Sequence, residues 1–83
     1  MYQIILKKRA KKFIGDLPKN ERELIVAEIE KLPDGEDIKP MQGHKNLFRL
    51  RVGSYRILYT VDNNQYIVLV IDAGNRGDIY KRY

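Results

Sequence analysis

The feature that most restricts the fold is a pair of β-rich runs on either side of Gly53 and Ser54. Residues 47–52 read LFRLRV and residues 55–62 read YRILYTVD, so apolar and polar side chains alternate through much of both runs. Such alternation is typical of half-buried strands, and a two-residue connection that contains glycine suits a tight β-hairpin. The segment therefore predicts two antiparallel strands joined by a two-residue turn.

Pairing outward from this turn sorts the side chains into two faces, because successive residues of a strand point to opposite sides of the sheet. One face receives six apolar or aromatic side chains and is the face we expect helices to cover: Phe48, Leu50, Val52, Tyr55, Ile57 and Tyr59. The other face sets Arg51 directly opposite Arg56, and Arg49 opposite Leu58. Like charges placed opposite each other destabilise a sheet. The arginine cluster therefore predicts an anion site, and guanidinium groups bind phosphate well.

A third strand follows this hairpin. A second turn is predicted at the Asn-Asn pair of residues 63–64, which sets Ile57 opposite Val70. Residues 66–71 read YIVLVI and are apolar on both faces, which favours a central, partly covered strand.

The segment after that strand, residues 72–80, reads DAGNRGDIY. Its glycines, Gly74 and Gly77, permit irregular backbone, so Arg76 is expected to leave the sheet at the end where the first hairpin turns. Tyr80 is expected nearby, where it could stack on a base. The two aspartates of this segment are candidates for ion pairs with the arginines.

The first half of the chain has the pattern of a strand followed by two helices. The β-rich run YQIIL begins at Tyr2, and an amphipathic helix follows it with apolar residues at i, i+3, i+4 and i+7: Ala10, Phe13, Ile14 and Leu17. Pro18 is expected to end this helix. Asn20 is expected to cap the second helix, with Glu23 as its capping-box partner. The apolar stripe of the second helix is Leu24, Ile25, Ile29 and Leu32.

Residues 33–46 are expected to form a loop, with Met41 as a candidate buried anchor. The order β-α-α-β-β-β, with a further short strand near Ile79, predicts an α+β fold. In this fold, two N-terminal helices pack on one face of a mainly antiparallel sheet. A chain of 83 residues suits one small domain, residues 1–83.

The composition narrows the classes of function. The chain has no cysteine and one histidine, His44, so neither a disulfide framework nor a Cys- or His-based metal site is expected. No apolar run approaches the roughly 20 residues that span a bilayer, and no signal peptide is visible, so we expect a cytoplasmic protein without membrane contact. The net charge of +5 suits RNA, DNA or an acidic protein. Self-repulsion that keeps a protein in solution would explain the same charge.

Basic residues outside the strands are candidates for contacts with RNA or the ribosome, although charge runs on helices are most often solvated faces. These candidates are Lys7, Lys8, Arg9, Lys11, Lys12, Lys45, Lys81 and Arg82.

The string LFRLRVGSYRILYTVD, followed by an apolar strand and then AGNRGDIY, resembles the RelE/ParE superfamily of toxins from type II toxin–antitoxin systems. The resemblance covers essentially the whole chain and is closer to the RelE-type mRNA interferases. It implies an endoribonuclease, independent of metals and cofactors, that cleaves mRNA in the ribosomal A site by attack of the 2′-OH on the phosphate. The catalytic candidates carried over by motif are Arg49, Arg51, Arg56, Arg76 and Tyr80.

Two positions depart from the family pattern. Arg51 stands where some members use a lysine as general base, and arginine is a poor base because it keeps its proton. Asn75 stands where many relatives carry a histidine.

The resemblance also implies partners, namely a cognate antitoxin, the ribosome and mRNA, with operator DNA bound only through the antitoxin complex. Two alternatives remain open. One is a ParE-type poison of DNA gyrase, and the other is a catalytically degenerate toxin that only binds its antitoxin.

Overall fold

The computed structural model describes residues 2–75 and 79–81. Over these residues the chain forms β1 (Gln3–Leu6), α1 (Lys8–Gly15), α2 (Lys19–Ile29), β2 (Ile38–Pro40), β3 (Phe48–Val52), β4 (Tyr55–Asp62) and β5 (Ile67–Asn75). The five strands of this described part form one sheet in the order β1-β5-β4-β3-β2. β1 runs parallel to β5, and the other neighbours are antiparallel. The predicted α+β fold with a mainly antiparallel sheet is confirmed.

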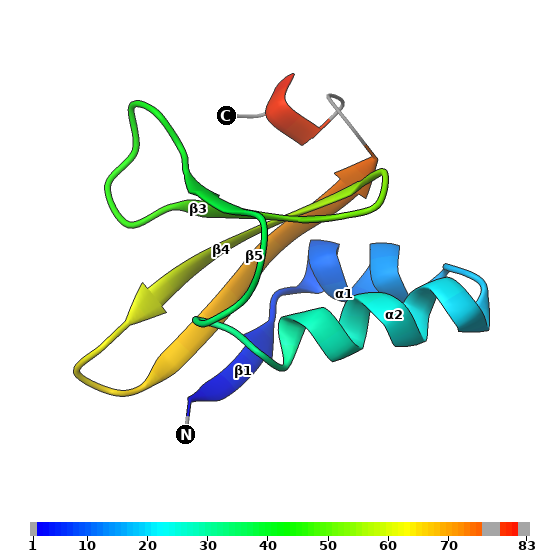
Figure 1. Ribbon diagram of the computed structural model, residues 1–83, viewed down its shortest axis with the longest axis horizontal. Helices are drawn as coiled ribbons and strands as arrows, with labels where there is room; N and C mark the ends of the chain where they lie inside the picture. The colour runs from blue at the N-terminus through cyan, green and yellow to red at the C-terminus, as the bar shows by residue number, and fades with distance from the viewer. Residues whose placement is uncertain (1, 76–78, 82–83) are drawn as a thin grey trace.

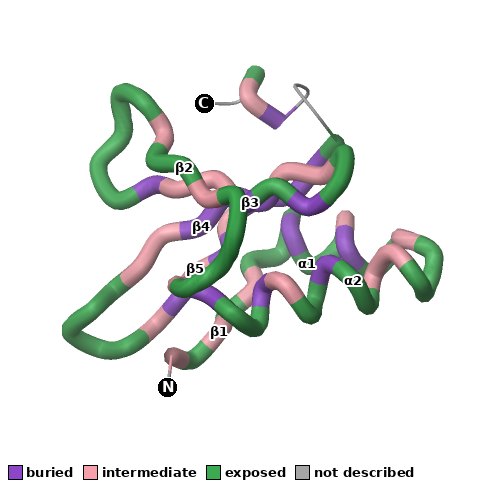
Figure 2. Tube along the Cα trace, in the orientation of Figure 1, coloured by how far each residue is buried: buried purple, intermediate pink, exposed green. Residues whose placement is uncertain are grey.

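Both helices lie on one face of the sheet, and the turn formed by residues 79–81 lies on the other side (Figure 1). The main core fills the space between the helices and the sheet. Its buried members come from α1, α2, the segment after α2 and the strands: Ala10, Ile14, Ile25, Ile29, Leu32, Leu50, Val52, Ile57, Tyr59, Val68, Val70 and Ala73. Figure 2 shows buried positions along the strands and on the sides of the helices that face them. The six side chains predicted for the covered face all contribute to this core or pack against it.

The hairpin between β3 and β4 has the predicted register. Val52 pairs with Tyr55, Arg51 with Arg56, and the pairing continues to the start of β3. Gly53 has φ +58°, a left-handed backbone conformation that glycine adopts without steric cost. The Gly-Ser pair therefore sets the register that separates the apolar face from the arginine face.

The predicted register between β4 and β5 is wrong. The connection contains four residues, 63–66, because Asp62 pairs with Ile67, and Tyr66 takes up a left-handed conformation with φ +56°. An irregularity between Leu58 and Tyr59 shifts the pairing by one more residue, so Ile57 lies opposite Ala73 instead of Val70. A β-bulge of this kind leaves no mark in the sequence of a strand that is apolar on both faces.

The start of α2 also differs from prediction. The helix begins at Lys19, directly after Pro18, so Asn20 lies inside it and none of the side chains that the structure describes caps its N-terminus. The fixed φ of proline suits this entry into the helix. The guanidinium of Arg22 donates to the carbonyl oxygen of Leu17 at 3.4 Å, which ties the turn between the helices to α2.

Two further segments have a secondary structure that differs from the prediction. The expected loop 33–46 contains the edge strand β2, which pairs Ile38 with Leu50 and Pro40 with Phe48. A strand of three residues that ends in proline is too short to show an alternating pattern, and proline is tolerated there because the strand is at the edge. Ile79, expected in a short strand, belongs to a single helical turn over residues 79–81. Neither α1 nor α2, in the described ranges, is long and apolar enough to cross a bilayer.

Candidate functional site

The face of the sheet opposite the helices, called the open face here, carries the arginines of β3 and β4. Arg51 pairs with Arg56, as the sequence predicts, and Arg56 pairs in turn with Gly74 of β5. Arg49 lies one pair further along the hairpin, opposite Leu58. The hairpin register alone therefore brings Arg49, Arg51 and Arg56 onto one surface.

A carboxylate that the sequence reasoning did not single out lies against two of these arginines. Asp37 precedes β2, and one oxygen of its carboxylate accepts a hydrogen bond from Nη2 of Arg49 at 2.7 Å. The other oxygen accepts from Nε of Arg51 at 2.5 Å. The backbone N–H of Arg51 donates to the carbonyl oxygen of Asp37 at 3.1 Å, so main chain and side chain hold the same pair together.

The electrostatics of Asp37 follow from these contacts. Desolvation raises the pKa of its carboxyl, but the hydrogen bond from Arg51 and the charges of Arg51, Arg49 and Lys39 outweigh that effect and hold the pKa below its ordinary value. Asp37 is therefore ionised at neutral pH and offsets one of the two guanidinium charges. The prediction that the arginines await an external anion is thus only partly met for Arg49 and Arg51.

The two arginines of β3 differ in exposure. The side chain of Arg49 is 12% exposed, whereas that of Arg51 is 50% exposed. Nε of Arg49 is buried without a hydrogen-bond partner among the residues that the structure describes. Arg49 thus behaves as a buried support for Asp37, and Arg51 presents its guanidinium to solvent.

Arg56 completes the described part of the cluster. Its Nη1 donates to the carbonyl oxygens of Gly53 and Tyr55 at 3.3 and 3.2 Å, which holds the side chain against the hairpin turn. None of the ion pairs found among the described residues involves Arg56. Its charge therefore adds to that of Arg51 directly across the hairpin.

Tyr80 also lies over the open face. It packs, partly buried, against a small cluster of buried residues formed by Leu47, Leu58 and Ile79. Gly74 lies in β5 beneath this cluster, and a Cβ added to it would meet Cβ of Ile79 at 3.3 Å. Gly74 was predicted to permit irregular backbone, but it allows the close approach of the 79–81 turn instead. The predicted site residues Arg76 and Arg82 lie outside the described residues.

The basic segment around α1 borders the open face. Lys7, Lys8 and Arg9 line a surface pocket with Ile71, and Ile71 packs against the same small cluster as Tyr80. Arg9 reaches Asp72 of β5, with 3.6 Å between Nη1 and Oδ2. Asp72 is fully buried and pairs with Leu58, so its carboxylate belongs to the open face.

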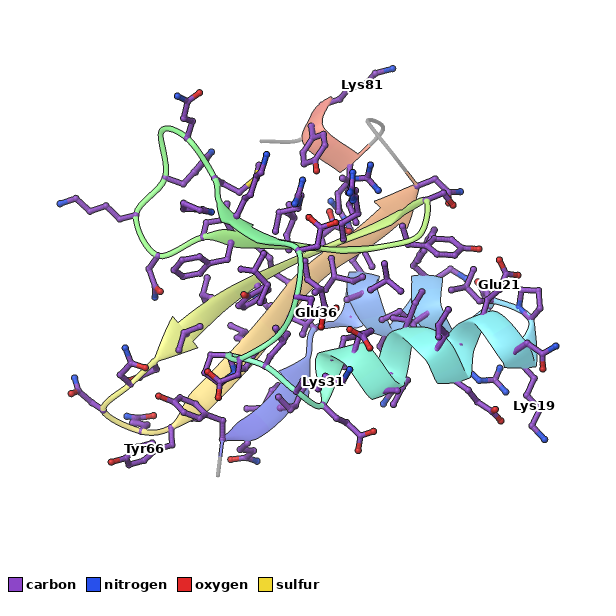
Figure 3. All side chains as sticks on the ribbon, in the orientation of Figure 1. Lys19, Glu21, Lys31, Glu36, Tyr66 and Lys81 are labelled. Carbon is purple, nitrogen blue, oxygen red and sulfur yellow. The ribbon has the colours of Figure 1, made fainter. Side chains whose placement is uncertain are left out.

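The other basic candidates that the structure describes lie at separate places on the molecule. Lys12 pairs with Asp16 on α1, and Lys11 and Lys45 are exposed. Lys81 extends from the 79–81 turn away from the sheet (Figure 3). The structure thus groups Lys7, Lys8 and Arg9 beside the open face but does not gather all basic candidates there.

A surface hollow lies away from the arginines of β3 and β4. This hollow, of about 660 Å³, lies at the other end of β4 and β5 and is lined by Asn46, Thr60, Val61, Asp62, Asn63, Asn64, Ile67 and Leu69. The arginines of β3 and β4 do not line it. The arginines supply the charge of the candidate site, and an exposed sheet surface suits a polymer better than a small molecule. No group of three or more potential metal ligands occurs within residues 2–75 and 79–81.

Comparison with known proteins agrees with this architecture. Residues 4–80 match the family described as "ParE toxin of type II toxin-antitoxin system, parDE". No curated protein matches the chain.

Solved structures give strong matches. A chain of the RelB–RelE complex from Methanococcus jannaschii is 27% identical with a TM-score of 0.75, covering 95% of this chain and 98% of that one. The intact E. coli RelBE complex gives 26% identity and a TM-score of 0.73, covering 90% of this chain and 96% of that one. The RelE–RelB complex from Pyrococcus horikoshii gives 24% identity and a TM-score of 0.78, covering 93% and 97%.

The family match spans most of this chain. Each structural match covers nearly all of this chain and nearly all of the matched chain. The protein therefore belongs to the ParE toxin family of type II toxin–antitoxin systems, within the RelE/ParE superfamily, and its fold is RelE-like.

Proposed function

We propose that this toxin is a ribosome-dependent endoribonuclease that cleaves mRNA in the ribosomal A site. The observation that carries the proposal is the pairing of Arg51 with Arg56 on the open face, since two guanidinium groups opposite each other call for an anion between them. The RelE-like fold supports the same activity.

In the proposed reaction, the ribose 2′-oxygen attacks the adjacent phosphorus and the bond from phosphorus to the 5′-oxygen breaks. The products are a 2′,3′-cyclic phosphate and a free 5′-hydroxyl, and the proton lost from the 2′-oxygen is balanced by one gained at the 5′-oxygen. Arg51 and Arg56 stabilise the negative charge that develops on the phosphorane. Arg49 supports them from beneath, Arg76 acts at the leaving 5′-oxygen, and Tyr80 stacks on or orients a nucleotide.

Proton transfer is the step to which the described side chains contribute least. Arginine keeps its proton at neutral pH, so Arg51 is a poor base where some relatives use a lysine. The lowered pKa of Asp37 makes its carboxylate a weak base as well. The mechanism therefore relies on orientation of the 2′-OH and on stabilisation of charge, each of which contributes several kcal/mol in other enzymes.

The proposal includes partners for the whole unit, residues 1–83. The basic segment from Lys7 to Lys12 contacts ribosomal RNA through its phosphates, together with Lys45, Lys81 and Arg82. A cognate antitoxin with acidic residues covers the open face, and operator DNA is bound only through that complex. The toxin acts in the cytoplasm, where its mRNA substrate is translated.

The direct test is mapping of mRNA 5′ ends in a translation extract to which the toxin is added. We expect Arg56→Ala to lower the cleavage rate about 10²- to 10³-fold, because one charge that stabilises the transition state is lost. Lys19→Ala is the matched control, since Lys19 is an exposed cation at the start of α2 whose side chain points away from the sheet (Figure 3). Cleavage by Arg56→Ala at the rate of Lys19→Ala would contradict the proposal.

The ParE family match favours one second candidate, a poison of DNA gyrase. Trapped gyrase–DNA breaks in treated cells, without new mRNA ends, would favour that activity. Ribosome binding with neither product would instead indicate a degenerate toxin whose remaining partner is its antitoxin.

A further inference from the structure

We infer that Asp37 is a positioning residue of the arginine face. Its carboxylate anchors Arg51 through Nε and thereby directs the terminal nitrogens of that side chain toward an RNA phosphate. The inference rests on the proposed function, because it concerns the same site, but it assigns a role to a residue that the sequence pattern did not reveal.

The contact between Arg51 and Asp37 leaves the outer end of the guanidinium for a ligand. A guanidinium is planar and carries five N–H donors, of which one is on Nε and four are on the terminal nitrogens. The hydrogen bond from Nε to the Asp37 carboxylate, at 2.5 Å, uses the single donor and fixes the plane of the group. Two of the four remaining donors, one on each terminal nitrogen, form the outer edge that binds a phosphate through two parallel hydrogen bonds. The side chain of Arg51 as a whole is half exposed.

Asp37 is itself held in place by Arg49. Nη2 of Arg49 donates both to its carboxylate, at 2.7 Å, and to its backbone carbonyl oxygen, at 3.3 Å. Arg49 is nearly buried, so the anchor beneath Asp37 is rigid. The backbone of Asp37 has φ +55°, a left-handed conformation that aspartate and asparagine tolerate better than most residues. The buried side chain of Arg49 therefore restricts the motion of Asp37, and Asp37 in turn restricts the motion of the exposed Arg51 side chain.

An alternative role for Asp37 is simple reduction of positive charge. The two roles predict opposite results when the carboxylate is neutralised. If Asp37 only offsets charge, its removal tightens RNA binding and does not slow turnover. If it positions Arg51, turnover slows although RNA still binds, because a small misplacement at the reacting centre is costly.

The experiment compares Asp37→Asn with Asp34→Asn. Asparagine suits the left-handed backbone of residue 37 and removes only the charge. Asp34 is exposed in the same loop, so its variant has the same change in net charge. For each protein, kcat and KM are measured on ribosomes carrying mRNA, and the Kd is measured with mRNA that has a 2′-deoxyribose at the cleavage position.

We expect kcat of Asp37→Asn to fall about 10- to 100-fold, whereas its Kd stays within about threefold of the parent and tightens no more than that of Asp34→Asn. An Asp37→Asn variant that turns over at least as fast as the parent would overturn the inference.

A spectroscopic measurement separates this inference from the proposed function. The exchange of the Arg51 Nε proton with water is followed by NMR in the free protein, which requires no cleavage. We expect slow exchange in the parent and in Asp34→Asn, and at least tenfold faster exchange in Asp37→Asn. If the parent does not cleave mRNA, the proposed function fails, and this exchange rate still decides the role of Asp37. Equal exchange in all three proteins would refute that role.

Discussion

The covered face and the open face of the sheet are built by the same strands, yet they are organised by different forces. On β3, Leu50 and Val52 point into the core beneath the helices, whereas Arg49 and Arg51 point to the other side. The covered face gains its stability from apolar area removed from water. The open face gathers like charges that its own carboxylates neutralise only in part. The covered face therefore holds the main core, whereas the open face combines a small apolar cluster with positive charge that is only partly offset.

The largest difference between the two faces is expected in the stability of variants at two adjacent residues of β3, Leu50 and Arg51. We expect Leu50→Ala to lower the free energy of unfolding by about 2–5 kcal/mol, because Leu50 is fully buried and its truncation leaves a cavity. Arg51→Ala should change that free energy by less than about 1 kcal/mol, since the side chain is half exposed. Urea denaturation measures both. Equal losses at the two positions would contradict the division between the faces.

The two arginines of β3 on the open face should contribute unequally to stability, because Arg49 is nearly buried and Arg51 is exposed. We expect Arg49→Ala to lower the free energy of unfolding by about 1–3 kcal/mol, which is more than Arg51→Ala, because Arg49 is nearly buried and its loss leaves Asp37 with one fewer donor. The same urea titrations provide the comparison. If Arg51→Ala proves the more destabilising of the two, Arg49 is not the support described above.

Lowering the pH should reduce the stability that Asp37 contributes to the open face. Because its pKa is lowered in the folded protein, the stability it contributes is present above the ordinary pKa of 3.8 and is lost as pH falls through the folded value. We therefore expect the difference in urea midpoint between the parent and Asp37→Asn to be constant from pH 7 to 5 and to shrink below about pH 4. A difference that persists unchanged at pH 2 would show that Asp37 does not act through its charge.

Much of this architecture could be predicted because the hairpin at Gly53 and Ser54 fixes its own register. The alternating pattern places Arg51 opposite Arg56 by local rules alone, and the structure agrees. The register of β5 could not be predicted in the same way. Its strand is apolar on both faces, so a longer loop and an irregularity at Leu58 leave the pattern unchanged.

Asp37 was missed for a different reason. It lies before an edge strand of three residues, in a stretch that reads as a loop, and only the pairing of β2 with β3 brings it to the arginines. Its left-handed backbone and its proximity to charge are products of tertiary structure. The sequence signal that could have found it is the Asp-Ile-Lys-Pro string as a short edge strand, which would have set Asp37 opposite Arg51.

The central claim is that guanidinium groups of the open face bind the RNA backbone, and NMR of the arginine side chains tests it most directly. Short single-stranded RNA with 2′-deoxyribose substitutions is titrated into the toxin at low salt. The account predicts that the signals of Arg51 and Arg56 shift with added RNA, whereas that of Arg22, which is bonded to the turn between the helices, does not. Shifts at Arg22 with none at Arg51 and Arg56 would contradict the account.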